Sequence, residues 1–173
     1  MKNICYVLML VLFVASCEKP NKIGFINNGD VINEYQAKKD LEAKFKSIQQ
    51  NLKRKADSIS LAYKVDAQAA DAKLRKVRSQ KEYDKISQEF SQKWSPVQEQ
   101  LKFQEQSMAE DFQTKIDTLI IKVKDFVKDY GKTNGYDFIL GTNEAAASVL
   151  YGKEQTDLTQ TILDALNAEY KKE

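Results

Sequence analysis

The sequence predicts an α+β protein, in which a long antiparallel α-helical hairpin is joined to a small β-sheet body with a C-terminal helix. Three observations support this. Only six Gly and two Pro occur among 173 residues, which favours long uninterrupted helices. Apolar residues recur every three or four positions through most of residues 41–130, as they do on one face of a helix. Short apolar segments typical of β-strands flank that region on both sides.

The N-terminus carries an export signal. Residues 4–15 form an apolar run that is too short to cross a bilayer, which takes about 20 helical residues, but suits the core of a secretory signal. The run ends in Val14-Ala15-Ser16-Cys17, which resembles a bacterial lipobox. We therefore expect residues 1–16 to be a lipoprotein signal peptide, Cys17 to be lipidated and residues 17–21 to be a tether. An ordinary signal peptide with an incidental cysteine is the alternative.

The body is expected to begin with a strand over residues 22–27 (KIGFIN). Asn28-Gly29 should break this strand, and Asp30 should cap the helix that follows. The first part of the body is thus placed at residues 22–35.

The hairpin is predicted over residues 36–130, and two capping boxes compete for its turn. They lie at residues 79–82 (SQKE) and 95–98 (SPVQ). A turn near 79 gives two arms of similar length, about 48 residues or ~70 Å, whereas a turn at 95 leaves about 30 residues without a partner. We therefore place the tip at residues 76–82 and interpret Pro96 as a kink in the returning helix.

Residues 131–173 are predicted to complete the body. Gly131 should end the second arm, and residues 136–140 (YDFIL) and 147–151 (ASVLY) should be strands. Thr156 or Asp157 should cap a final helix. The apolar side of that helix consists of Leu158, Ile162, Leu163 and Leu166.

The composition argues against an enzyme. There is no histidine, so the commonest general base and metal ligand is missing. Both cysteines, Cys5 and Cys17, lie in the N-terminal segment, which excludes a Cys-based zinc site from the folded part. No Gly-rich phosphate loop or GxSxG motif occurs. We therefore expect no catalytic residue, metal or cofactor.

Charge is concentrated locally rather than globally. The net charge is only +2, so no nucleic-acid partner is expected. Residues 73–93, however, hold seven cations and three anions, a difference of 7 − 3 = +4 around the proposed tip. An ordinary solvated surface is one interpretation, and a positive rim for anionic headgroups or acidic client segments is the other. The candidate basic tip consists of Lys73, Arg75, Lys76, Arg78, Lys81 and Lys85.

Several segments resemble the Skp/OmpH-like periplasmic chaperones, here as a lipid-anchored variant. Residues 22–27 and 134–140 (NGYDFIL) are similar to the first two strands of that family. Within residues 149–167, VLYG, DLT and ILDALN resemble its closing strand and terminal helix. The resemblance implies a jellyfish-like homotrimer joined through the β bodies, whose arms surround a cavity for unfolded outer-membrane proteins, without nucleotide. The best-known members are soluble and strongly basic, and this chain differs in both respects.

Two further sets of residues are candidates for a function of this kind. Leu61, Val65 and Phe103 lie off the apolar stripes and could hold clients, or could pack within the hairpin or against another subunit. Ile23, Phe25, Ile139 and Leu150 could form an oligomer interface or the core of the body itself. The leading hypothesis is an ATP-independent holdase, bound to a membrane in the periplasm through Cys17. The alternative is a structural or adaptor coiled-coil lipoprotein of the cell envelope.

Overall fold

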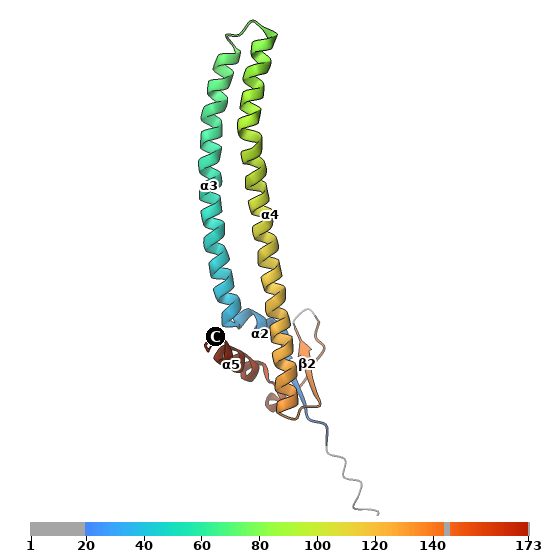
Figure 1. Cartoon of the computed structure of the whole chain (residues 1–173). Coiled ribbons are helices and arrows are strands. Elements are labelled where there is room, and N and C mark those ends of the chain that lie inside the picture. The colour runs from blue at the N-terminus through green and yellow to red at the C-terminus, as the bar shows by residue number, and fades with distance from the viewer. Residues whose placement is uncertain (1–19, 144–145, 173) are drawn as a thin grey trace, which may run out of the picture. The chain divides into compact units, whose positions relative to one another are not determined.

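A computed structural model describes residues 20–143 and 146–172 of the chain (Figure 1). The predicted signal peptide and Cys17 lie outside these residues. The elements, in chain order, are β1 (Ile23–Asn27), α2 (Asn28–Glu34), α3 (Gln36–Leu74), α4 (Gln80–Thr133), β2 (Phe138–Thr142), the short 3-10 helix η1 (Glu154–Thr156) and α5 (Thr159–Tyr170). They confirm the predicted fold class, a long antiparallel helical hairpin with a small sheet and a C-terminal helix. Trimer formation stays a prediction.

The described chain divides into two compact units. The sheet unit contains the residues up to Val31 together with Lys124–Leu166. The arm unit contains Ile32–Val123 together with the residues from Asn167 onward.

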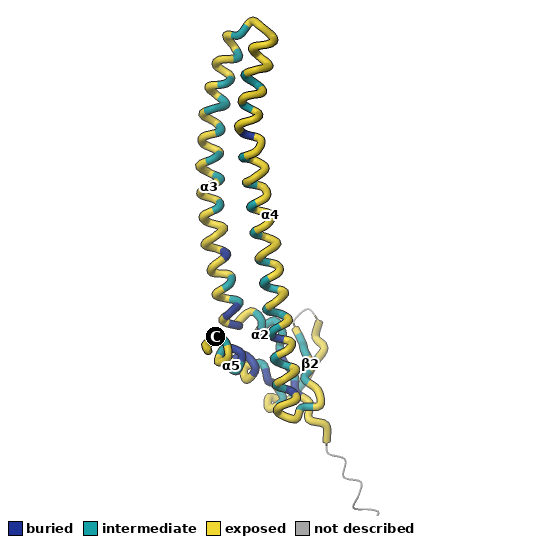
Figure 2. Tube along the Cα trace, in the orientation of Figure 1, coloured by how far each residue is buried: buried dark blue, intermediate teal, exposed yellow. Residues whose placement is uncertain are grey.

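The arm unit consists mainly of α3 and α4, which run side by side in opposite directions (Figure 1). They are joined through residues 75–79, within or next to the predicted tip at residues 76–82. Half-buried positions follow the facing sides of the two helices, while their outer sides are exposed (Figure 2). Because two helices alone can shield only one stripe each, this arm has a thin core.

Helix α4 runs through Pro96 without interruption. A proline nitrogen has no hydrogen to donate, so one backbone hydrogen bond of the helix is missing at this residue. The chain does not reverse there, which excludes the second of the two capping boxes as the site of the turn.

The sheet unit is organised around two parallel strands, with Ile23 opposite Phe138 and Phe25 opposite Leu140. Side chains alternate across a strand, so these four residues share one face, while Ile26 and Ile139 lie on the other. The second face is covered. Ile26 is buried, as are Val31 and the predicted apolar side of α5, namely Leu158, Ile162, Leu163 and Leu166.

Several helix boundaries differ from the predicted ones because other residues supply the caps. Asn27, not Asp30, caps the first helix, α2, since its side-chain oxygen accepts hydrogen bonds from the backbone N–H groups of Gly29 (3.0 Å) and Asp30 (3.3 Å). That helix then ends before Tyr35, whose backbone is extended. Of the two predicted caps of the last helix, Asp157 accepts the hydrogen bond from the Thr159 N–H at 2.8 Å.

Gly131 does not end the second arm, as the sequence suggested, because α4 continues to Thr133. The chain leaves the helix through Gly135, two residues beyond its end, which has a φ of 68° in the left-handed region that glycine tolerates. The Tyr136 N–H donates to the Gly131 carbonyl at 2.9 Å, which completes a Schellman-type end. Strand β2 consequently starts at Phe138, two residues later than expected.

The prediction of a strand over residues 147–151 is wrong. The described residues of this segment form bends without a ladder partner, and Leu150 is 90% exposed. The sheet contains β1 and β2. On the other edge of β1, Phe25 forms an isolated bridge with Asp157, and the Leu158 N–H donates to the Phe25 carbonyl at 2.8 Å. Strand propensity depends on the packing context, and residues 147–151 pair with neither strand of the sheet.

Candidate functional site

Two aromatic clusters hold the arm together. Phe45 of α3 packs on Phe112 of α4, with ring centroids 4.9 Å apart. Further along the arm, the Tyr63 ring packs against Phe90 and Trp94, with ring centroids 5.4 and 5.3 Å away. Such pairs contribute about 0.5–1.5 kcal/mol each beyond the area they bury. They fix the register of the two helices.

A charged clamp lies beside the second cluster. The Asp66 carboxylate accepts hydrogen bonds from Lys93 and from the indole nitrogen of Trp94, the latter at 3.1 Å. The Lys93 hydrogen bond, opposed by partial desolvation and aided by the charges of Lys93 and Lys73, lowers the pKa of Asp66 below its ordinary value. The clamp therefore joins α3 and α4 by an ionic contact at neutral pH.

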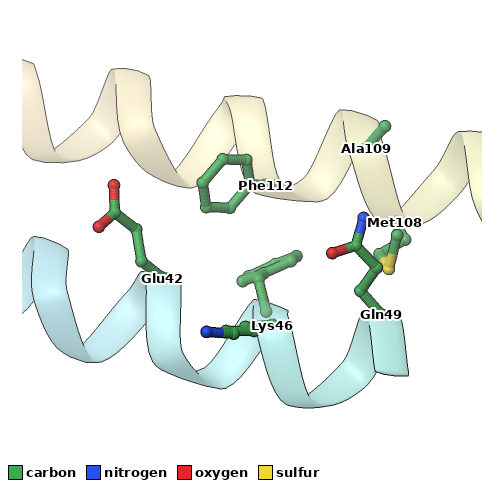
Figure 3. Close-up of a pocket in the computed structure, with 7 residues that line it drawn as sticks. Glu42, Lys46, Gln49, Met108, Ala109 and Phe112 are labelled. Carbon is green, nitrogen blue, oxygen red and sulfur yellow. The ribbon is translucent and has the colours of Figure 1, made fainter. Parts of the chain in front are cut away.

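An open groove runs along one side of the hairpin, from the Phe45–Phe112 pair toward the second cluster. Its two sections have volumes of about 470 and 460 Å³ and share Gln49 and Met108, so they are continuous. We call it the arm groove. The first section, drawn in Figure 3, is also lined by Glu42, Phe45, Lys46, Ala109 and Phe112. The second is also lined by Gln50, Leu52, Lys53, Ala56 and Glu105.

The candidate client-binding residues are not brought together by the structure. Leu61 and Val65 are more than half exposed and lie one turn apart on α3, on the side turned away from Tyr63 and its contacts. Phe103 is equally exposed but belongs to the outer side of α4. The three residues thus occupy outer faces of two different helices, and none of them lines the arm groove.

The candidate tip residues do surround the connection between the helices, and all six are exposed. Arg75 forms an ion pair with Asp71 at 2.8 Å, and Lys85 lies 3.9 Å from Glu89. Within the described ranges no ion pair involves the other four, which are Lys73, Lys76, Arg78 and Lys81. The tip therefore retains an unneutralised positive charge.

The uncovered face of the sheet is apolar. This sheet face consists of Ile23, Phe25, Phe138 and Leu140, of which Phe138 is 57% and Leu140 43% exposed. A hollow of about 260 Å³ adjoins it, and Leu150 and Tyr151 are exposed close by in sequence. Among the four predicted body residues, Ile139 belongs instead to the covered face, where its side chain packs at Gly131. Phe138, Leu140 and Tyr151 are additions that the sequence did not single out.

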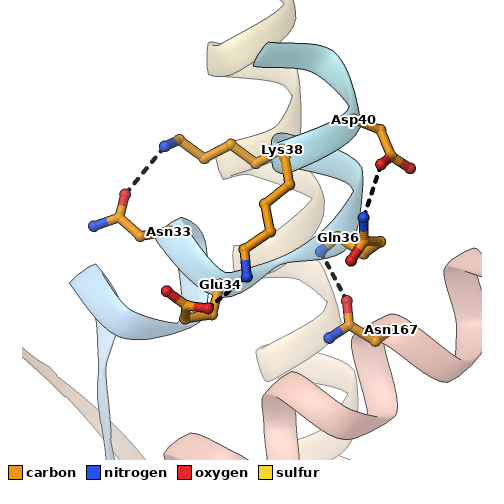
Figure 4. A network of polar contacts seen from close by, with 7 residues as sticks. Asn33, Glu34, Gln36, Lys38, Asp40 and Asn167 are labelled. Carbon is orange, nitrogen blue, oxygen red and sulfur yellow. Dashed lines mark hydrogen bonds and ion pairs between the residues drawn. The ribbon is translucent and has the colours of Figure 1, made fainter. Parts of the chain in front are cut away.

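A polar network fixes the start of α3 in the arm unit (Figure 4). The Asn167 side-chain oxygen accepts a hydrogen bond from the Gln36 N–H at 2.9 Å, so a residue 131 positions away caps the helix. Lys38 donates to Asn33 at 3.1 Å and to Glu42 at 2.6 Å, and Tyr170 donates to Asp40 at 3.1 Å. The end of α5 thereby holds the base of the arm.

The described residues offer little for metal or membrane chemistry. Across positions 20–143 and 146–172 no group of three or more His, Cys, Asp or Glu residues is placed to hold a metal ion. None of the helices in those ranges is long and apolar enough to span a bilayer.

Comparison with known proteins gives consistent matches along the chain. Residues 22–166 match the family described as "Outer membrane protein (OmpH-like)". A curated relative, the chaperone protein Skp of Vibrio cholerae serotype O1, is 28% identical over 176 residues, which cover 96% of this chain and 99% of the relative. A crystal structure of an OmpH-like protein from Caulobacter crescentus CB15 superimposes with a TM-score of 0.71 at 14% identity. The superposition covers 88% of this chain and 87% of the Caulobacter chain, and it supports the fold alone.

Proposed function

The chain belongs to the OmpH-like outer membrane protein family, and we propose that it is an ATP-independent holdase for unfolded outer-membrane proteins in the periplasm. The observation that carries the proposal is the family match over residues 22–166, which includes both the arm and the sheet unit. The named relative is a chaperone that the chain matches over nearly its whole length.

The physical character of the arm supports holding rather than catalysis. Its large apolar residues Leu61, Val65, Phe103 and Ile121 are all more than half exposed, as a surface for varied unfolded chains requires. Such contacts are individually weak, because each buries one side chain, and they do not impose a shape on the client. Release then needs only a competing structure that buries the same client residues better.

We further propose that the sheet face joins three copies of the chain. Ile23, Phe25, Phe138 and Leu140 form an apolar face that a single chain leaves uncovered, and uncovered contiguous apolar surface is typical of association sites. A homotrimer would present three arms to one client. The unpaired cations of the tip would attract acidic client segments, over a distance limited by a Debye length of about 8 Å.

Lipidation of Cys17 is the third part of the proposal. Cys17 precedes the first residue of β1, Ile23, by six positions, so a fully extended tether reaches roughly 20 Å. An acylated Cys17 would therefore keep the sheet unit next to the membrane surface. Conversion of Cys17→Ala should release the chain from membrane fractions, and a variant that still partitions fully with membranes contradicts the anchor.

Client breadth tests the holdase function. A holdase suppresses aggregation of several unrelated urea-unfolded barrel proteins, whereas an adaptor lipoprotein binds one folded partner. We expect the full chain to lower light scattering for every such client at a similar molar ratio. Protection of none of them refutes the proposal.

A further inference from the structure

We propose that the arm groove binds an extended client segment in which apolar side chains alternate with acidic ones. This inference rests on the proposed holdase function and assigns a site and a chemical class of segment to it. It adds one continuous surface to the weak contacts that the scattered residues Leu61, Val65 and Phe103 would make.

The groove exists because polar residues interrupt the apolar interface between the helices. Glu105 lies in phase with the apolar stripe of α4, and Lys55 donates across the interface to Gln104 at 3.0 Å. At Glu105 the α4 side of the interface therefore presents a charged side chain instead of an apolar one. The remaining space has a volume of about 470 Å³ in one section and 460 Å³ in the other, within the range of ligand sites.

The floor of the groove suits varied apolar side chains. Phe45 and Phe112 line one section, Leu52 lines the other, and Met108 lies where the two meet. Figure 3 shows the Phe112 ring in the space between the helices, with Gln49 and Met108 at one end. Met108 is the one methionine of the described residues, and methionine adapts its unbranched, polarisable side chain to different partners.

The length of the groove fits an extended segment. Glu42 and Ala56 mark its ends on α3, a distance of roughly 21 Å at 1.5 Å per residue. A β-strand rises about 3.3 Å per residue and directs every second side chain to the same side. About six client residues therefore fit, with three apolar side chains on the floor. Transmembrane β-strands have this alternation.

Positive charge along the rim of the groove, at Lys46 and Lys53, favours acidic residues at the polar positions of the client segment. Lys46 and Lys53 line the groove and have no ion pair among residues 20–143 and 146–172. Glu42 is neutralised by Lys38 at 2.6 Å, which leaves Glu105 as the one unpaired anion of the lining. The two lysines thus outnumber it, and the polar side of an acidic segment would face them.

Anisotropy of labelled ten-residue peptides measures this binding to the full chain. The probe alternates Leu or Tyr with Asp or Ser. One comparison peptide has Lys in place of Asp, and another has the same composition with its apolar residues grouped. We expect the alternating acidic peptide to bind most tightly. Equal binding of all three overturns the inference.

Variants locate the site. Ala109→Phe and Ala56→Phe fill the groove and should weaken the acidic peptide roughly tenfold. Ala62→Phe is the matched control, since Ala62 is exposed on α3 and does not line the groove, and it should leave binding unchanged. Helix content by circular dichroism must be equal in all three. Equal binding by filled and control variants overturns the assignment.

A charge pair of variants tests the rim. Lys46→Gln combined with Lys53→Gln should weaken the acidic peptide roughly fivefold and leave the lysine peptide unaffected or tighter. The matched control combines Lys64→Gln with Lys102→Gln, two exposed lysines outside the groove. The same loss in both double variants would refute a local role of the rim.

Photo-crosslinking tests the site without the groove-filling substitutions, so its result does not depend on whether those variants fold. A photoreactive side chain at Gln49 should capture an unfolded barrel protein, and one at the exposed Gln68 should capture much less. Equal capture at both positions, in a chain that prevents aggregation, overturns the groove and leaves the holdase function intact. Capture at Gln49 without any protection from aggregation supports the groove as a peptide site and refutes the holdase function.

Discussion

Replacing the exposed apolar residues of strand β2 should separate the proposed trimer into monomers. The double change Phe138→Thr and Leu140→Thr removes two large side chains from the sheet face. Threonine is itself favoured in strands, so the strand should persist. Because about half of each residue is already exposed in the single chain, the folded monomer should lose less stability than the assembled form.

The magnitude follows from the exposed fractions. Phe138 is 57% exposed, which for an aromatic residue of roughly 200 Å² is roughly 110 Å², or roughly 3 kcal/mol at 25 cal/mol per Å². Leu140 at 43% adds roughly 1 kcal/mol. Three protomers together lose roughly 12 kcal/mol, or about nine orders of magnitude in the association constant. For a trimer this raises the half-assembly concentration by about four orders of magnitude.

Sedimentation of the full chain over a range of concentrations is the assay. Wild type should sediment as a trimer, and the double variant as a monomer at the same concentration. Phe103→Thr is the matched control, because it removes an equally exposed aromatic residue from the arm instead of the sheet face. A double variant with the mass of wild type would refute the assignment of the interface to this face.

Four further outcomes follow from the contacts of the arm. Asn167→Ala removes the cap of α3 and should cost about 1 kcal/mol, seen as a fall of about 2–4 °C in the thermal midpoint; an unchanged midpoint contradicts the capping role. Trp94→Ala, at a residue only 6% exposed, should cost about 3–5 kcal/mol in urea unfolding, and a cost below 1 kcal/mol would show that the aromatic cluster does not hold the arm. Because the hydrogen bond from Lys93 lowers the pKa of Asp66 in the folded chain, wild type should exceed Asp66→Asn in stability above about pH 4 and lose that advantage as pH falls through the lowered pKa. A difference in midpoint that is the same at pH 7 and pH 2 would refute that linkage. Client association measured by stopped flow should slow as salt rises, and Lys76→Gln with Arg78→Gln should flatten this dependence; equal rates at low and high salt argue against a role of the tip charge.

The hairpin was accessible to sequence reasoning because its signal is periodic and long. The stripes of α3 and α4 repeat every three or four residues, and arm length decided between the two capping boxes. Nothing local could have placed the cap of α3, because Asn167 reaches Gln36 from the far end of the chain. The cap of this helix depends on a tertiary partner, and such a partner cannot be read from the sequence around residue 36.

The sheet unit was harder to predict for a related reason. Residues 147–151 have a strand-like composition, but they pair with neither β1 nor β2, and composition alone does not reveal this. The grouping of Phe138 and Leu140 with Ile23 depends on parallel register, which no single segment reveals. The arm groove likewise depends on which residues of two helices meet, which the periodicity of one helix does not reveal.

The holdase function can be measured by light scattering while a urea-unfolded outer-membrane barrel protein is diluted with and without the full chain. Sedimentation of the same samples gives the mass of the complex. The account predicts suppressed scattering and a complex that contains three copies of the chain. Unchanged scattering at a molar excess of the chain would contradict it.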